Sequence, residues 1–137
     1  MCSSDLKGMV APMDIVAPGG DLIIVSECSE GMGSKEFVDA QRRLVEGGAE
    51  RFMHEISGKQ FADVDEWQTQ MQLKPMRVGT IHLYTGGLPE QHHPLTGVRM
   101  VGSAADAVHA SVARSGERRI AVIPEGPYVV PVHRPDA

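Results

Sequence analysis

The chain has 137 residues, of which 42% are hydrophobic and 23% are charged, and its formal net charge is −5. This composition is typical of one globular domain with a core, and the acidic balance argues against nucleic acid as a partner. No apolar run reaches the length of a membrane span, and two cysteines without metal or disulfide spacing favour a cytoplasmic protein.

The first predicted elements are a short helix and a strand. The helix is expected from Lys7 onward and ends before the Pro-Gly-Gly run at residues 18–20. Residues 22–25 then form a continuous apolar run without alternation, which is typical of a strand buried on both faces.

Three helices are expected next. Ser34 is the predicted N-cap of a helix that ends at Gly47-Gly48, and a second helix follows directly. A third helix begins near Ala62 and meets Pro75 at its end. Trp67, on this third helix, is expected to contact the core.

The second half of the chain predicts three more strands and one more helix. The strands are expected at residues 78–84, 98–101 and 120–123, and Ser103 caps an alanine-rich helix at residues 104–114. The polar stretch between the first two of these strands is expected to be a long exposed loop. The alternation predicts an α/β fold with three layers, in which helices flank a mostly parallel sheet of about four strands.

The loop at residues 26–34 is the candidate for a binding cleft. It leaves a strand at its carboxyl end and enters a helix, which is where α/β sheets usually bind ligands. Glu27, Gly31, Gly33 and Ser34 are the candidate cleft residues, and the two glycines would let a ligand approach the backbone. The pattern lacks the third glycine of a dinucleotide fingerprint and the lysine of a phosphate loop, so a structural turn stays open as the alternative.

The histidines and Cys28 do not predict a metal site. His92 and His93 are adjacent, and adjacent residues of an extended chain point to opposite sides, so a solvated loop is the better interpretation. His54 and His82 lie in other elements. Cys28 is interpreted as a small, partly buried thiol, because no base can be assigned to it.

Several short motifs occur in an order that resembles the C-terminal domain of the nickel-dependent lactate racemase family. They are Lys-Gly-Met at residues 7–9, Gly-Gly before the first strand, Glu-Gly-x-Gly-Ser at residues 30–34, a Trp-Gln helix and Ile-Pro-x-Gly at residues 123–126. The resemblance runs from Lys7 to about Pro131, almost the whole chain.

The resemblance implies a racemase or epimerase of 2-hydroxy acids that depends on a nickel-pincer nucleotide. In that family the nickel-binding and catalytic histidines, and the cofactor-bearing lysine, belong to a larger N-terminal domain, so none of those roles passes to a histidine of this chain. The family's active-site lysine of the C-terminal domain falls on Lys7, which is therefore the candidate catalytic residue, facing the substrate carboxylate across an interdomain cleft. The expected partners are the N-terminal domain and a small 2-hydroxy acid, and the chain alone is expected to be inactive and without cofactor.

The first six residues do not fit this resemblance. The family tends to have a glutamine three positions before the lysine, where this chain has Ser4, and the string CSSDL resembles the translation of a sequencing adapter. We therefore expect residues 1–6 to be a non-native leader and residues 7–137 to be a lactate racemase-like C-terminal domain without its N-terminal catalytic domain. The alternative is a stand-alone α/β module that binds a small anionic ligand at the Gly31/Gly33 loop.

Overall fold

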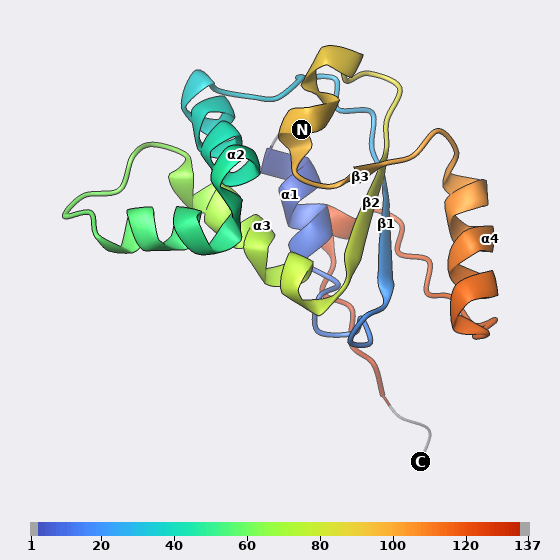
Figure 1. The fold of residues 1–137 in the computed structure, drawn as a ribbon. Helices are drawn as coiled ribbons and strands as arrows, with labels where there is room; N and C mark the ends of the chain where they lie inside the picture. Colours follow the sequence, from blue (N-terminus) through green and yellow to red (C-terminus); the bar gives the residue numbers. More distant parts are fainter. Residues whose placement is uncertain (1–2, 135–137) are drawn as a thin grey trace.

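The computed structural model describes residues 3–134, which fold around a parallel three-stranded sheet (Figure 1). The strands are β1 (Asp21–Val25), β2 (Thr80–Tyr84) and β3 (Arg99–Met100), in the spatial order β1-β2-β3. Helices α1, α2 and α3 lie on one side of the sheet and α4 lies on the other. The predicted α/β fold with a parallel sheet between helices is confirmed, with three strands in place of four.

The fourth predicted strand does not form in the described part of the chain. Residues 120–123 pair with no strand, because the segment that contains them is separated from β1 by a cavity. β1 therefore has only β2 beside it and is an edge strand. The expectation that residues 22–25 are buried on both faces is wrong for the same reason, since Leu22, Ile23 and Ile24 are only half-buried and Val25 is exposed.

Helix α1 (Ser3–Val10) begins four residues before the predicted start at Lys7. Leu6 and Met9 on this helix are buried in the core, while Lys7 is exposed. Of the predicted leader, residues 1 and 2 lie outside the described residues and residues 3–6 form the first part of α1. The origin of residues 1–6 stays a prediction.

Helix α2 (Lys35–Ser57) follows the sequence prediction closely. The hydroxyl of Ser34 accepts a hydrogen bond of 3.1 Å from the backbone N–H of Phe37, so Ser34 is the N-cap. The helix is broken at Gly48, whose φ of 79° and ψ of 167° lie outside the helical region. The predicted division into two helices at Gly47-Gly48 is confirmed, because only glycine adopts such a conformation at little cost.

Helix α3 (Glu66–Val78) begins four residues after Ala62 and continues beyond Pro75 to Val78. The residues of α3 that face the core are Glu66, Gln68, Thr69, Gln72, Leu73 and Pro75. Trp67 lies between these positions on the helix and is 54% exposed, so the expectation that it contacts the core is wrong.

The long polar loop after β2 is more ordered than the sequence suggests. Its second half is the short helix η1 (Glu90–Thr96), and both Leu88 and Thr96 are buried. Gln72 donates a hydrogen bond of 2.7 Å to the carbonyl of Thr96 and accepts one of 2.6 Å from Gln41. This buried chain of amides ties η1 to α3 and α2, so the expectation of an exposed loop is wrong for this part.

The last elements are helix α4 (Ala104–Ser115) and the short helix η2 (Gly126–Tyr128). Ser103 is the N-cap of α4, as predicted, and accepts a hydrogen bond of 3.2 Å from the backbone N–H of Asp106. η2 packs against α1, where the side chain of Pro127 lies beside Gly8. The chain therefore returns from α4 across the molecule to its first helix.

Two clusters of buried side chains form the core. One lies between α1, the sheet and the loop after β1, and the other lies between the two halves of α2 and α3. The first contains Leu6, Met9, Cys28, Met32, Phe37, Ile81, Leu83 and Leu88. The second contains Ala40, Leu44, Phe52 and Leu73.

Candidate functional site

The loop after β1 is held tightly against the loop after β2. The hydroxyl of Thr85 donates a hydrogen bond of 2.9 Å to the carbonyl of Glu27. Gly87 approaches the same carbonyl so closely that a Cβ there would lie 2.2 Å from its oxygen. Glycine is therefore required at residue 87. The loops after β1 and β2 are in direct contact at the carboxyl ends of the two strands.

The same loop turns through three residues with positive φ: Cys28, Gly31 and Gly33, at 51°, 63° and 83°. The backbone N–H of Gly31 donates a hydrogen bond of 2.9 Å to the carbonyl of Cys28, which closes the turn. Cys28 and Met32 point into the core, while a Cβ at Gly31 or Gly33 would meet nothing within 4 Å. The two predicted glycines therefore lie where the backbone has open space beside it.

Ser34 has a structural function at the end of this loop. Besides capping α2, its hydroxyl donates a hydrogen bond of 2.6 Å to the carboxylate of Asp65. Asp65 also accepts a hydrogen bond of 2.7 Å from Gln68 and has a φ of 61°. The N-termini of α2 and α3 are therefore joined beside the candidate loop, and the hydroxyl of Ser34 is engaged in joining them.

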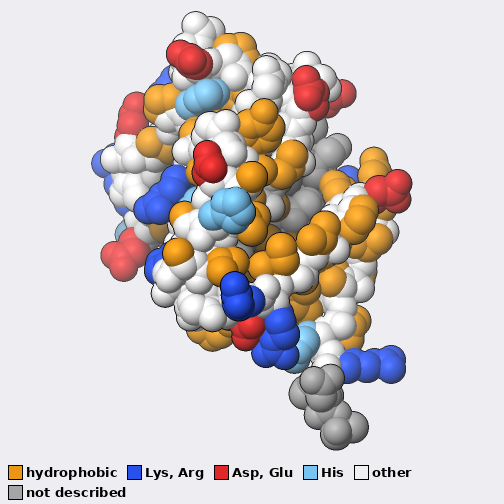
Figure 2. All heavy atoms as spheres, turned by 90° about the vertical axis from the view of Figure 1, so that its right-hand side faces the viewer, with side chains coloured by type: hydrophobic (Ala, Val, Ile, Leu, Met, Phe, Trp, Pro, Cys, Tyr) orange, Lys and Arg blue, Asp and Glu red, His pale blue; other side chains and the backbone are white. Residues whose placement is uncertain are grey.

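A large cavity lies beside β1, away from the loop after it. Its volume is about 1250 Å³, and it is bounded by β1, by α4 and by the segment at residues 117–128. Figure 2 views the molecule from the α4 side and shows hydrophobic side chains along a hollow there. Of the predicted site residues, Glu27 lines this cavity, while Lys7, Gly31, Gly33 and Ser34 do not.

Lys7 lies on the exposed side of α1. Within the part of the chain that the structure describes, only its backbone has a hydrogen-bond partner, because its carbonyl accepts from the N–H of Ala11. The next residue, Gly8, lines the cavity, so α1 forms part of its boundary. The ammonium group of Lys7 is thus available to solvent or to a ligand.

Sequence reasoning did not detect a polar cluster at the amino end of β1. The carboxylate of Asp21 lies 3.0 Å from His82 Nε2 and accepts a hydrogen bond of 2.6 Å from Arg114. Burial raises the pKa of Asp21, but hydrogen bonds from Ser111, His82 and Arg114 outweigh this effect and lower the pKa below its usual value. The cluster joins β1, β2 and α4. No local sequence motif indicates it, because its members are far apart in the sequence.

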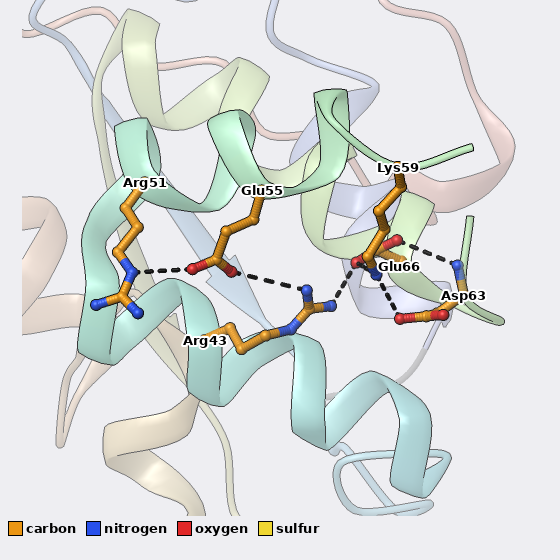
Figure 3. Close-up of polar contacts among 6 residues, drawn as sticks. All are labelled: Arg43, Arg51, Glu55, Lys59, Asp63 and Glu66. Carbon is orange, nitrogen blue, oxygen red and sulfur yellow. Dashed lines mark hydrogen bonds and ion pairs between the residues drawn. The ribbon is translucent and has the colours of Figure 1, made fainter. Parts of the chain in front are cut away.

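A second cluster was also missed and surrounds Glu66 at the start of α3 (Figure 3). The Glu66 side chain is 3% exposed and pairs with Arg43 and with Lys59 Nζ, which lies 2.8 Å away. Burial raises the pKa of Glu66, but hydrogen bonds from Lys59 and Arg43 outweigh it and lower the pKa to about 2. Arg43 also contacts Glu55, which pairs with Arg51, so the network joins both halves of α2 to α3.

The histidines of the described residues do not form a cluster with one another. His93 Nε2 lies 3.0 Å from the carbonyl of Leu88 within the η1 loop, and His54 and His109 are exposed on helices. Among the described residues, no group of three or more His, Cys, Asp or Glu could hold a metal ion. The described residues therefore do not offer a set of ligands for nickel.

Comparison with known proteins adds one match. A family model described as the lactate racemase C-terminal domain matches residues 3–131, and no curated protein matches the chain. Within the described residues, none of the helices is both long and apolar enough to cross a membrane.

Proposed function

The chain belongs to the lactate racemase C-terminal domain family, and from this premise we propose that it is the C-terminal part of a racemase or epimerase of 2-hydroxy acids. The observation that carries the proposal is the match over residues 3–131, which includes every element from α1 to η2. The enzyme works as a full-length protein in the cytoplasm, with an N-terminal domain that supplies the other wall of the cleft.

Lys7 is the residue through which this domain acts on the substrate. A 2-hydroxy acid carries a carboxylate, and a lysine ammonium in a cleft can bind and neutralise that charge. The exposed position of Lys7, with no side-chain partner among the described residues, supports this role. α1 also begins at the end of the sheet where the strands have their carboxyl ends (Figure 1).

The loop at residues 26–34 forms part of the cleft wall. Glu27 is exposed beside the cavity, and Gly31 and Gly33 leave open space next to the backbone, which supports this placement. Ser34 contributes by fixing the end of the loop to Asp65 rather than by binding substrate.

The nickel-pincer nucleotide is a cofactor of the full-length enzyme in this proposal. The described residues do not fit it, because they offer no ligand set for the metal. The cofactor would therefore be held by the N-terminal domain, and no catalytic step at the cofactor is derived from this chain.

The test is the substitution Lys7→Ala in a complete, cofactor-loaded enzyme that carries this domain. A hydrogen bond to a charged group contributes about 1.5–3 kcal/mol, so kcat/KM for racemisation is expected to fall about 10- to 150-fold. Lys74→Ala, which removes an exposed lysine from α3, is the matched control and should leave kcat/KM unchanged. Equal activity of the Lys7→Ala variant and the unchanged enzyme would refute the role of Lys7.

A further inference from the structure

Helix α4 is packed against the rest of the domain by few apolar contacts. It has 12 residues, of which only Ala107 is buried. Among the described helices and strands, α4 packs closely only against β1, and it lies on the opposite side of the sheet from α1, α2 and α3 (Figure 1). Its side chains Val108 and Val112 are half-buried and line the cavity of about 1250 Å³. An element with so little buried apolar surface can separate from a fold that otherwise stays intact.

The start of α4 is anchored to the sheet, whereas the chain after its end is irregular. The backbone N–H of Val101, three residues before α4, donates a hydrogen bond of 3.0 Å to the carbonyl of Leu83 in β2. Residues 116–123, which follow α4, form no helix or strand, and residues 116–122 are exposed. Residues 101–103 are therefore the fixed point about which α4 can move.

The other end of α4 is held by one buried carboxylate. Ser111 and Arg114, in the second half of α4, both donate hydrogen bonds to Asp21, and the bond from Arg114 is 2.6 Å long. Arg114 lies about 15 Å along the helix from Ala104, at 1.5 Å per residue. The second carboxylate oxygen of Asp21 lies 3.0 Å from His82 Nε2. Asp21 thus joins the far end of α4 to both β1 and β2.

We propose that α4 is a lid that opens about residues 101–103 and is held closed by the latch, which consists of Asp21, Ser111 and Arg114. When the latch is broken, α4 separates from β1 as a unit, and the cavity beside β1 opens to solvent. The same movement uncovers Asp21 and His82, whose side chains are 4% and 10% exposed when the lid is closed. The proposal is independent of the proposed function, which involves Lys7 and the loop at residues 26–34.

The first experiment measures hydrogen exchange of the backbone amides by mass spectrometry at pH 7. In the unchanged chain, the amides of α4 should exchange together and faster than those of α3. Arg114→Gln removes a hydrogen bond to a charged group, so exchange in α4 should become about 10-fold faster, while α3 keeps its rate. Arg118→Gln, which removes an exposed arginine just after α4, is the control and should change neither rate. Exchange in α4 that is no faster than in α3, or that is unchanged in Arg114→Gln, would overturn the proposal.

A double-mutant cycle separates the latch from a direct effect of Arg114 on its own helix. An arginine in the last turn also stabilises a helix through the helix dipole, without any partner on the sheet. In an Asp21→Asn background, Arg114→Gln should change exchange in α4 by less than about 2-fold, because the partner is already lost. A 10-fold effect that persists in this background would contradict the latch. The first experiment replaces only exposed arginines, so it does not depend on the folding of Asp21→Asn.

A chemical probe tests what the opening uncovers. Diethyl pyrocarbonate modifies a histidine only when it can reach the imidazole ring. We expect His82 to be modified about 10-fold faster in Arg114→Gln than in the unchanged chain. His109, which is exposed on α4, serves as the internal reference and should react equally in both. Equal rates of modification of His82 in the two chains would show that α4 does not cover this histidine.

Discussion

At the scale of single residues, Glu66 shows how a buried charge is stabilised in this domain. Its carboxylate is almost fully enclosed, yet it stays ionised because Arg43, Lys59 and the backbone N–H of Asp63 all donate to it. A carboxylate removed from water is costly unless it is paired and hydrogen-bonded in this way. The network therefore makes stability depend on pH.

The direction of this dependence follows from the lowered pKa of Glu66. Its stabilising contribution is complete above the usual value of 4.5 and is lost as the pH falls toward the folded-state value of about 2. The full contribution is about 3 kcal/mol. Asp21, whose pKa is also lowered, adds a contribution of the same sign.

We predict that Glu66→Gln lowers the free energy of unfolding at pH 7 by about 2–3 kcal/mol, because Arg43 and Lys59 lose the buried carboxylate that they share and keep only their more exposed partners Glu55 and Asp63. The variant should also lose less stability than the unchanged chain between pH 5 and pH 3. Urea unfolding at both pH values measures this, with Glu46→Gln, an exposed glutamate of α2, as the control. Parallel losses in Glu66→Gln and the unchanged chain would show that Glu66 does not cause the acid sensitivity.

At the scale of elements, the two helix caps can be compared directly. Ser34 and Ser103 each accept one backbone N–H, but only the hydroxyl of Ser34 also donates to Asp65. We predict that Ser103→Ala costs about 1 kcal/mol and Ser34→Ala about 2 kcal/mol. Urea unfolding of the two variants measures the difference. Equal costs would mean that the hydrogen bond from Ser34 to Asp65 adds no stability.

The elements also show which parts of the fold the sequence could predict. Both serine caps and the break at Gly48 are local signals, and the structure confirms them. The start of α3 was placed too early because Lys59 and Asp63 contact Glu66 and keep the residues before it in a loop. The fourth strand was predicted from the local sequence at residues 120–123, although pairing depends on a neighbouring strand edge.

The candidate site was predicted only in part. The loop at residues 26–34 lies at the carboxyl end of β1, where parallel strands place their ligands, so its position followed from the order of elements. The function of Ser34 in joining α3, and the cluster of Asp21, His82 and Arg114, depend on contacts between distant segments. No periodicity or local motif contains that information.

At the scale of the whole molecule, the sheet is covered unevenly. Helices α1, α2 and α3 pack on one side of it (Figure 1), whereas a cavity of about 1250 Å³ separates β1 from the segment at residues 117–128. Among the described residues, β1 pairs with β2 alone, and Val25 at its end is exposed, so this edge is the less enclosed part of the domain.

The chain contains a single tryptophan, Trp67, which follows Glu66 directly and is half in contact with water. Its indole is therefore a natural fluorescent probe beside the charged network that joins α2 to α3. Because Trp67 lies on α3 and the three strands contain no tryptophan, its emission can follow the opening of one face of the domain. The separation of α3 from α2 can therefore be observed without any added label.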